Sequence, residues 1–315
     1  MKLTFENNFN QIVDISENIT DLTFENYFNQ EVELPENLTH LTFGYHFNKK
    51  VELPKNLTHL TFGDYFNQMV ELPENLINLT FGYYFNQKVE LPKNLIHLTF
   101  EGKFNQEVEL PKNLTHLTFG NEFNKEVNLP ERLTYLTFGY QFNQVIILPK
   151  NLTHLTFGDY FNQMVELPEN LIYLSFGTYF NQEVKLPEKI SHLTLGYKFD
   201  KKLNIPNNIK YLTLDCINQY LLDNLPNSIE ELVLGYNFDL ELNDLPNGIK
   251  NIKFINIHYK KELNNLTNSI EYLELPLYYD KQIFKLPKKI KKIKCNKEYI
   301  FIDKLKINDI EVIVY

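Results

Sequence analysis

The sequence predicts an all-β solenoid, in which short parallel strands stack with one strand in each repeat. Three observations lead to this prediction. A Phe-Asn pair recurs every 19 residues, a Leu-Pro pair marks most units, and a Leu-x-Phe alternation of period two lies between these marks. Because 19 residues with a Pro after Leu leave little room for a return helix, we expect little or no helix.

Two phenylalanine columns define the regular part of the array. Asn follows Phe at ten positions from Phe9 to Phe180, and Asp200 follows Phe199, always at the same interval. A second Phe column lies four residues earlier and ends at Phe176. These columns, of eleven and ten residues, hold 21 of the 25 Phe. Residues 53–77 recur unchanged as residues 148–172, which indicates duplication of whole units.

The strand of each unit is predicted where Leu41 and Phe43 alternate with His40 and Thr42. Successive side chains of a strand point to opposite faces, so the Leu and Phe face the core while the His and Thr face solvent. One repeat cannot bury its own apolar face, and stacking of neighbours therefore supplies a shared interior. The predicted core columns are represented by Val32, Leu34, Leu38, Leu41, Phe43 and Phe47.

After residue 200 the unit lengthens to 20 or 21 residues, but Leu-Pro pairs at 225–226, 245–246 and 286–287 still mark it. We therefore predict a single repeat solenoid over residues 1–315. Regular repeats occupy 1–200, and divergent repeats with a C-terminal cap occupy 201–315. The complete array should contain about 17 strands.

The Asn column and the Gly column have structural interpretations. The Asn follows a core Phe where the chain turns, so its side chain can satisfy backbone groups that have no ladder partner. Glycine recurs after the second Phe, as at Gly44, but Glu25 and Glu101 occupy the same slot. A left-handed backbone conformation is therefore not expected to be obligatory there.

Composition and charge exclude several classes of protein. The net charge of −9 does not favour nucleic acid, and no apolar run is long enough to span a membrane. Cys216 and Cys295 cannot frame a disulfide scaffold, and no signal peptide begins the chain. We expect a reducing, cytoplasmic location, with a nuclear one left open, and no cofactor.

One column of the predicted solvent-facing side is rich in histidine. Adjacent His pairs could form a metal or pH-sensing site. A zinc site needs three or four converging ligands, however, and this column supplies no carboxylate or Cys beside its pairs, so a recognition surface is the favoured interpretation. The column contains His40, His59, His97, His116, Tyr135, His154, Tyr173 and His192.

The two positions that follow the Gly slot vary between repeats and often hold tyrosine. Tyr offers a large amphipathic contact area at low entropic cost, and it is enriched at protein interfaces. We expect a partner at this edge and on the His-rich face beside it. The tyrosines in question are Tyr45, Tyr65, Tyr83, Tyr84, Tyr140, Tyr160 and Tyr179.

Residues 66–82, which read Phe-Asn-Gln-x-Val-x-Leu-Pro-x-x-Leu-x-x-Leu-Thr-Phe-Gly, resemble the FNIP repeat of social amoebae and giant DNA viruses. They are also similar to the short leucine-rich repeats of bacterial effectors. The resemblance implies a leucine-rich-repeat-like, right-handed array. Many viral members of that family couple an F-box to the repeats and so look like substrate receptors of ubiquitin ligases. Here Leu3-Thr4-Phe5 already belongs to a repeat, so that role does not carry over directly.

The polar residues are column copies, whereas a catalytic site is a single asymmetric cluster. The sequence therefore favours a non-enzymatic scaffold that binds a protein partner. One alternative is a substrate-recognition module of a ubiquitin ligase that acts without its own F-box. A remote alternative is an enzyme in the divergent C-terminal region. Because the chain both opens and finishes with a repeat strand, end-to-end self-association is a further expectation.

Overall fold

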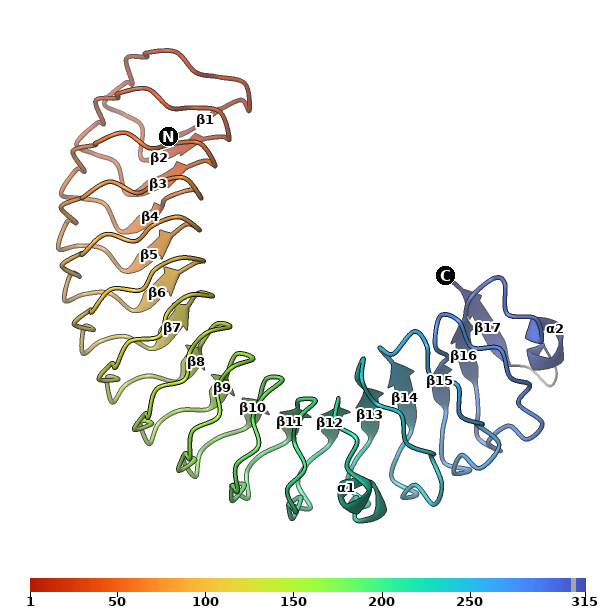
Figure 1. Ribbon diagram of the computed structural model, residues 1–315. Coiled ribbons are helices and arrows are strands. Elements are labelled where there is room, and N and C mark those ends of the chain that lie inside the picture. Colours follow the sequence, from red (N-terminus) through yellow and green to blue (C-terminus); the bar gives the residue numbers. More distant parts are fainter. Residues whose placement is uncertain (307–309) are drawn as a thin grey trace. The chain divides into compact units, whose positions relative to one another are not determined.

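The computed structural model describes residues 1–306 and 310–315 and divides into two compact parts, Met1–Phe161 and Asn162–Tyr315. In each part the chain winds into rungs, with one short strand per repeat and the return path in turns and extended segments (Figure 1). Seventeen strands and two short helices occur among the described residues, which confirms the predicted solenoid with almost no helix.

The first part contains nine strands, and each pairs in parallel with the next. Their register places equivalent residues side by side, for example Leu22 beside Leu41 and Phe24 beside Phe43. Residues at equivalent positions of successive repeats therefore form a row that runs across the strands of the sheet. The strands are β1 (Lys2–Phe5), β2 (Asp21–Phe24), β3 (His40–Phe43), β4 (His59–Thr61), β5 (Asn78–Phe81), β6 (His97–Phe100), β7 (His116–Phe119), β8 (Tyr135–Thr137) and β9 (His154–Thr156).

The core of the first part consists of stacked Leu and Phe rows. Leu41, Phe43 and Phe47 are at most 2% exposed, as predicted. The Phe43 ring stacks on Phe47 in its own rung, with centroids 3.7 Å apart, and lies 5.8 Å from Phe62 in the next rung. Burying each such side chain contributes about 1.5–3 kcal/mol before conformational entropy is counted.

Two of the predicted core columns are less buried than expected. Val32 and Leu34 are only half-buried. They lie on the return segment, which covers the core with one side and meets solvent with the other. Strict alternation in that segment therefore does not produce full burial, and the prediction was wrong for these two columns.

The Asn column forms the predicted ladder. Asn48 Oδ1 accepts the backbone N–H of Asn67 at 3.0 Å, and Asn29 Oδ1 accepts that of Asn48 at 2.9 Å. The following Gln strengthens the ladder, since Gln68 Nε2 donates to Asn48 Oδ1 at 3.0 Å. Each rung thus satisfies the turning backbone of the next rung, where no strand pairing is available.

The glycine column has a packing role. A Cβ at Gly63 would lie 2.0 Å from the carbonyl oxygen of Gly44 in the preceding rung, closer than any real contact. Among the glycines only Gly102 has a positive φ, of +38°. Close approach of neighbouring turns therefore favours glycine here, and a left-handed conformation is not needed, as the Glu residues in this column had suggested.

The second part contains eight strands and both helices, and its strands also pair in parallel with their successors. The helices lie in divergent repeats and each spans about one turn. The elements are β10 (Tyr173–Ser175), β11 (His192–Leu195), β12 (Tyr211–Leu214), α1 (Gln219–Asp223), β13 (Glu231–Leu234), β14 (Asn251–Phe254), β15 (Tyr272–Glu274), β16 (Lys292–Cys295), α2 (Ile302–Leu305) and β17 (Glu311–Val314).

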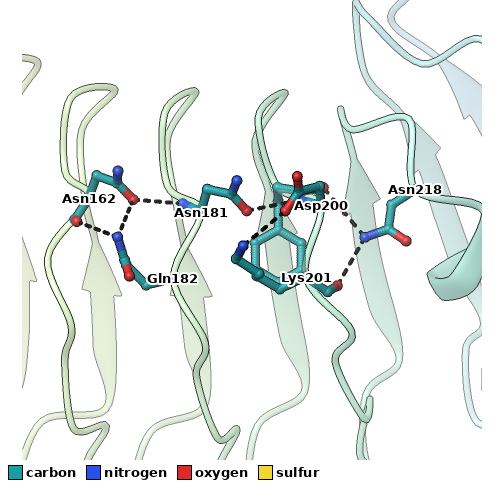
Figure 2. Close-up of polar contacts among 7 residues, drawn as sticks. Asn162, Asn181, Gln182, Asp200, Lys201 and Asn218 are labelled. Carbon is teal, nitrogen blue, oxygen red and sulfur yellow. Dashed lines mark hydrogen bonds and ion pairs between the residues drawn. The ribbon is translucent and has the colours of Figure 1, made fainter.

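The Asn ladder changes in the second part at the boundary of the regular repeats. Figure 2 shows Asn162 accepting from the Asn181 backbone and Asn181 accepting from the Asp200 backbone, at 2.9 and 3.1 Å. In the next rung the buried Asn218 instead donates to the Lys201 carbonyl at 3.0 Å and caps α1 by accepting from the Leu221 N–H. The regular ladder therefore stops at Asp200.

Buried tyrosines replace phenylalanines in the later rungs of the second part. The hydroxyls of Tyr259 and Tyr299 donate to the carbonyls of Leu240 and Lys281 in the preceding rungs, at 2.9 and 2.7 Å. Burial raises the pKa of Tyr299 to about 12. These hydroxyls provide a contact between rungs after the amide ladder has ended.

Candidate functional site

The solvent-facing side of the strands in the first part carries two rows of polar side chains. Strands β3 and β6 show the pattern, because their Leu and Phe are buried while His and Thr are exposed or half-buried. His40 and His97 are exposed, whereas His59 and His116 are half-buried. The ring row, as we name the first of these rows, consists of His40, His59, His97, His116, Tyr135 and His154.

The rings of this row stack face to face. The ring centroids of His40 and His59 lie 4.2 Å apart, with planes inclined by 13°. Asn78 separates this pair from the longer stack, in which successive centroids from His97 to His154 lie 4.2, 4.4 and 4.2 Å apart. These distances are shorter than the strand spacing of about 4.8 Å, so the rings lean onto one another.

A hydroxyl group on the preceding residue fixes the tautomer of several histidines. Thr39 Oγ1 lies 2.9 Å from the carbonyl oxygen of Thr20 and also 2.9 Å from His40 Nδ1. Two oxygens at 2.9 Å need a proton between them, and the hydroxyl has only one, so Nδ1 must carry the proton of the second bond. His40 Nε2 is then an acceptor when the ring is neutral. The same arrangement holds His59 through Thr58.

The surroundings of His59 and His116 in the ring row favour the neutral imidazole. Burial lowers the pKa of His59 and His116 below the usual 6.5, and the neighbouring histidines lower it further. The stacked planes are nearly parallel, so the Nε2 lone pairs of neighbours do not converge on one point as tetrahedral metal coordination requires. Among the described residues there is also no group of three or more His, Cys, Asp or Glu that could hold a metal ion.

In the second part charged residues join the rings at and around the solvent-facing side of the strands. Tyr173 and His192 are tilted and 6.0 Å apart, and His192 stacks on Tyr211 at 4.3 Å. In later rungs Glu231 pairs with Lys253 across neighbouring strands at 2.8 Å. Here the charged side chains of the face are neutralised by their own neighbours, as also at Lys250–Glu230, Glu274–Lys294 and Lys292–Glu311.

The predicted tyrosines lie beyond the C-terminal ends of the strands, where the chain leaves the sheet in each rung. Tyr65 and Tyr84 have ring centroids 4.9 Å apart, and Lys103 Nζ lies 4.8 Å above the Tyr84 ring. Tyr45 meets Tyr65 edge-on at 5.0 Å. The tyrosine edge, as we name it, comprises Tyr45, Tyr65, Tyr83, Tyr84, Tyr140 and Tyr160 in the first part, and Tyr179 occupies the equivalent position in the second.

The structure therefore arranges the predicted residues in two separate places, the ring row and the tyrosine edge, and not as one cluster. It also adds residues that the sequence prediction had left out. Tyr27 stacks on His46 at 5.1 Å, and His46 on Tyr65 at 5.3 Å, which extends the tyrosine edge. Tyr211 extends the His and Tyr column in the second part. Their shared column positions in the repeat were the signal that could have identified them.

Neither cysteine has the surroundings of a nucleophile. Cys216 and Cys295 are both buried, and burial raises the pKa of Cys216 to about 12. A thiol in this state is not activated at neutral pH.

Within residues 1–306 and 310–315 no helix is long and apolar enough to cross a membrane.

Comparison with known proteins identifies the repeats. The family model described as FNIP Repeat matches twelve overlapping stretches. None of the curated proteins is significantly similar to this sequence. The matched stretches are residues 9–46, 28–64, 47–71, 66–103, 85–122, 104–141, 123–160, 142–179, 164–198, 180–217, 199–237 and 217–256.

Solved structures resemble the chain over most of its length. The crystal structure of CroV588, a circular leucine-rich-repeat protein from a giant virus, is 35% identical with a TM-score of 0.70. That match covers 100% of this chain and 56% of CroV588, so the chain spans little more than half of that protein. YopM from Yersinia enterocolitica is 21% identical with a TM-score of 0.61, covering 88% of this chain and 67% of YopM, and shows the same fold.

Proposed function

The chain belongs to the FNIP repeat family, and from this premise we propose that it is a non-enzymatic scaffold that binds a protein partner. Leucine-rich-repeat-like arrays are typical protein-interaction modules, because stacked rungs present extended surfaces built from few residue types. We place the partner on the ring row and the tyrosine edge.

The observation that carries this proposal is the stacked ring row. Its side chains are held in place before any partner arrives, by stacking and, at His40 and His59, by the hydrogen bond from Nδ1 to the preceding Thr. Ordering of flexible side chains is one of the main costs of association, so a surface of fixed rings binds at a lower entropic cost. The neutral rings of His59 and His116 also avoid the desolvation cost of burying charge.

The tyrosine edge supports the same proposal with different chemistry. Tyr27 and Tyr45 are 51% and 41% exposed although they contact neighbouring rings. Each can add apolar area and a hydroxyl to an interface. Exposed contiguous aromatic groups of this kind are typical of interaction sites.

Selection of binders from a peptide library tests the proposal and does not require the natural partner to be identified. Peptides displayed on phage are selected on the wild-type chain, and enriched clones are then assayed against a face variant with His40→Ser, His59→Ser and His116→Ser. A matched control variant changes three exposed residues of the return segments, Met69→Ser, Val145→Ser and Ile147→Ser.

We expect most enriched clones to lose at least about tenfold in affinity for the face variant and to bind the control variant like the wild type. Circular dichroism of both variants establishes that they are folded. Clones that bind the face variant unchanged, or that lose affinity for the control variant instead, would show that the binding surface lies elsewhere.

A further inference from the structure

A shallow groove of about 580 Å³ runs along the N-terminal ends of strands β4 to β8 in the first part. The tyrosine edge lies at the C-terminal ends of the same parallel strands, so the groove lies at the opposite edge of the sheet. A second hollow of about 470 Å³ shares Asn113 and Arg132 with it. The groove is lined by Asn56, Thr58, Asn75, Ile77, Asn94, Ile96, Asn113, Thr115 and Arg132.

Three residues that line the groove differ from the usual residue of their column in the repeat. Ile77 and Ile96 replace the Thr that the other rungs from β3 to β9 carry directly before the strand, as at Thr58 and Thr115. Arg132 replaces an Asn and is the only arginine of the chain. In an array of near-identical units, these three changes give one stretch of the surface an apolar floor and a guanidinium that no other stretch has.

Arg132 is held in position and has unused hydrogen-bond donors. Its Nη1 donates to Asn113 Oδ1 at 3.2 Å, and Asn113 Nδ2 in turn donates to the Lys93 carbonyl at 3.0 Å. Arg132 is exposed and forms no ion pair with any described residue. A guanidinium has five N–H donors in a fork that matches a carboxylate, so most of them are available to a ligand.

The charge around Arg132 is locally positive. In the turns of the two adjacent rungs the chain carries Lys112 and Lys150, against Glu131 in the same rung as Arg132. Although the chain is acidic overall, screening confines the effect of more distant exposed carboxylates to about 8 Å at physiological salt. This part of the groove is therefore complementary to an anion.

The asparagines along the groove present acceptors. The Nδ2 atoms of Asn75 and Asn94 donate to the carbonyls of Lys55 and Glu74 in the preceding rungs, both at 2.9 Å. Their Oδ1 atoms receive no hydrogen bond from any described residue. They can therefore accept hydrogen bonds from the backbone N–H groups of a bound chain.

We propose that this groove binds the C-terminal end of a peptide. The terminal carboxylate lies on Arg132, where the groove ends, apolar side chains cover Ile77 and Ile96, and backbone N–H groups of the ligand donate to Asn75 and Asn94. Three rungs separate Ile77 from Arg132, about 14 Å, which four extended residues span at about 3.3 Å each.

The groove lies at the edge opposite the tyrosine edge and borders the ring row at Thr58–His59 and Thr115–His116. Arg132, Ile77 and Ile96 belong to neither part of the partner surface proposed above, so variants at these positions test the groove separately.

The test uses a fluorescein-labelled peptide that ends in Leu-Val-Leu-Val with a free carboxylate, and the same peptide with a C-terminal amide. Fluorescence anisotropy measures their affinity for the wild-type chain and for Arg132→Asn. Asn is the usual residue of this column, so this variant should fold like its neighbours. A second variant, Ile77→Thr with Ile96→Thr, restores the usual residue at both floor positions.

We expect the acid peptide to bind at least about tenfold more tightly than the amide, and this difference to disappear in Arg132→Asn. The Ile-to-Thr variant should weaken both peptides while keeping the preference for the acid. An amide-capped peptide with an internal Asp serves as a further arm, and equal binding of this peptide would overturn the assignment to a chain terminus. Equal affinity for acid and amide, unchanged binding to Arg132→Asn, or no binding to the wild type would each overturn the proposal.

Discussion

Replacement of Asn48 by Ala tests the amide ladder on which the stacking of rungs depends. The Asn48 side chain accepts two hydrogen bonds at 3.0 Å, from the Asn67 backbone N–H and from Gln68 Nε2. Asn48→Ala removes this acceptor. The backbone bond from Asn48 to Asn29 Oδ1 is unaffected, so the change is confined to one step of the ladder.

The structure sets the magnitude of the stability loss expected for Asn48→Ala. The Asn67 N–H lies in a part-buried turn, and a buried donor left without a partner costs about 1–3 kcal/mol. Gln68 keeps its bond to the Asn48 carbonyl at 3.4 Å, so it adds little to this cost. We expect the free energy of unfolding to fall by about 1–3 kcal/mol. Asn48→Asp keeps an acceptor oxygen, as Asp215 does for the Asn237 N–H at 2.7 Å, and should cost less than about 1 kcal/mol.

Two measurements check this prediction. Urea unfolding gives the change in stability, and hydrogen exchange of the Asn67 amide reports the local bond even if unfolding of the array is not two-state. Exchange of this amide should accelerate by about 5- to 150-fold in Asn48→Ala, since each 1.4 kcal/mol corresponds to a factor of ten. If Asn48→Ala and Asn48→Asp behave alike, or if protection of Asn67 is unchanged, the ladder does not stabilise the stacking as we argue.

Three further predictions concern other features of the array. Gly63→Ala places a Cβ 2.0 Å from the Gly44 carbonyl oxygen and should lower the unfolding free energy by about 1–3 kcal/mol, measured by urea unfolding; a stable variant would contradict the close-approach argument. The pKa of His59 and His116 is lowered in the folded state, so the unfolded state binds more protons below pH 6.5 and stability falls as the pH drops through that value. Thermal unfolding at pH 7.5 and 5.5 checks this, and the double variant with Phe at both positions should lose part of the pH dependence. End-to-end association of strand edges stays a prediction; light scattering should show a mass that rises with concentration, and a constant monomer mass would exclude it.

Strand positions and most of the core were predictable because they depend only on the period. Leu41 and Phe43 alternate with polar residues and recur every 19 residues, which is sufficient to place one strand and its buried side. The Asn ladder was also predictable, since an amide after a core residue at a turn has few other uses. The return segment was less predictable, because the burial of Val32 and Leu34 depends on the path of the chain in three dimensions.

Other features depend on side-chain conformation that periodicity does not contain. The bond between Thr39 and His40 Nδ1 requires a particular rotamer of both residues, so no pattern in the sequence revealed the tautomer. Helix α1 spans five residues and is too short to give a periodic signal. Arg132 was one of two departures from Asn within its column, the other being Lys189, and its significance appeared only when the groove showed which other departures lie beside it.

The hydrogen bonds of the Asn ladder join residues 19 or 20 positions apart, and equivalent atoms take part at each step from Asn10 to Asn67. An insertion or deletion of one complete unit therefore replaces every severed bond with another of the same kind. A shift by a single residue, in contrast, would set amides against side chains that cannot accept from them. Such a gene can change its product's length in fixed steps without redesigning any contact, and the copy of residues 53–77 at 148–172 shows that this has happened.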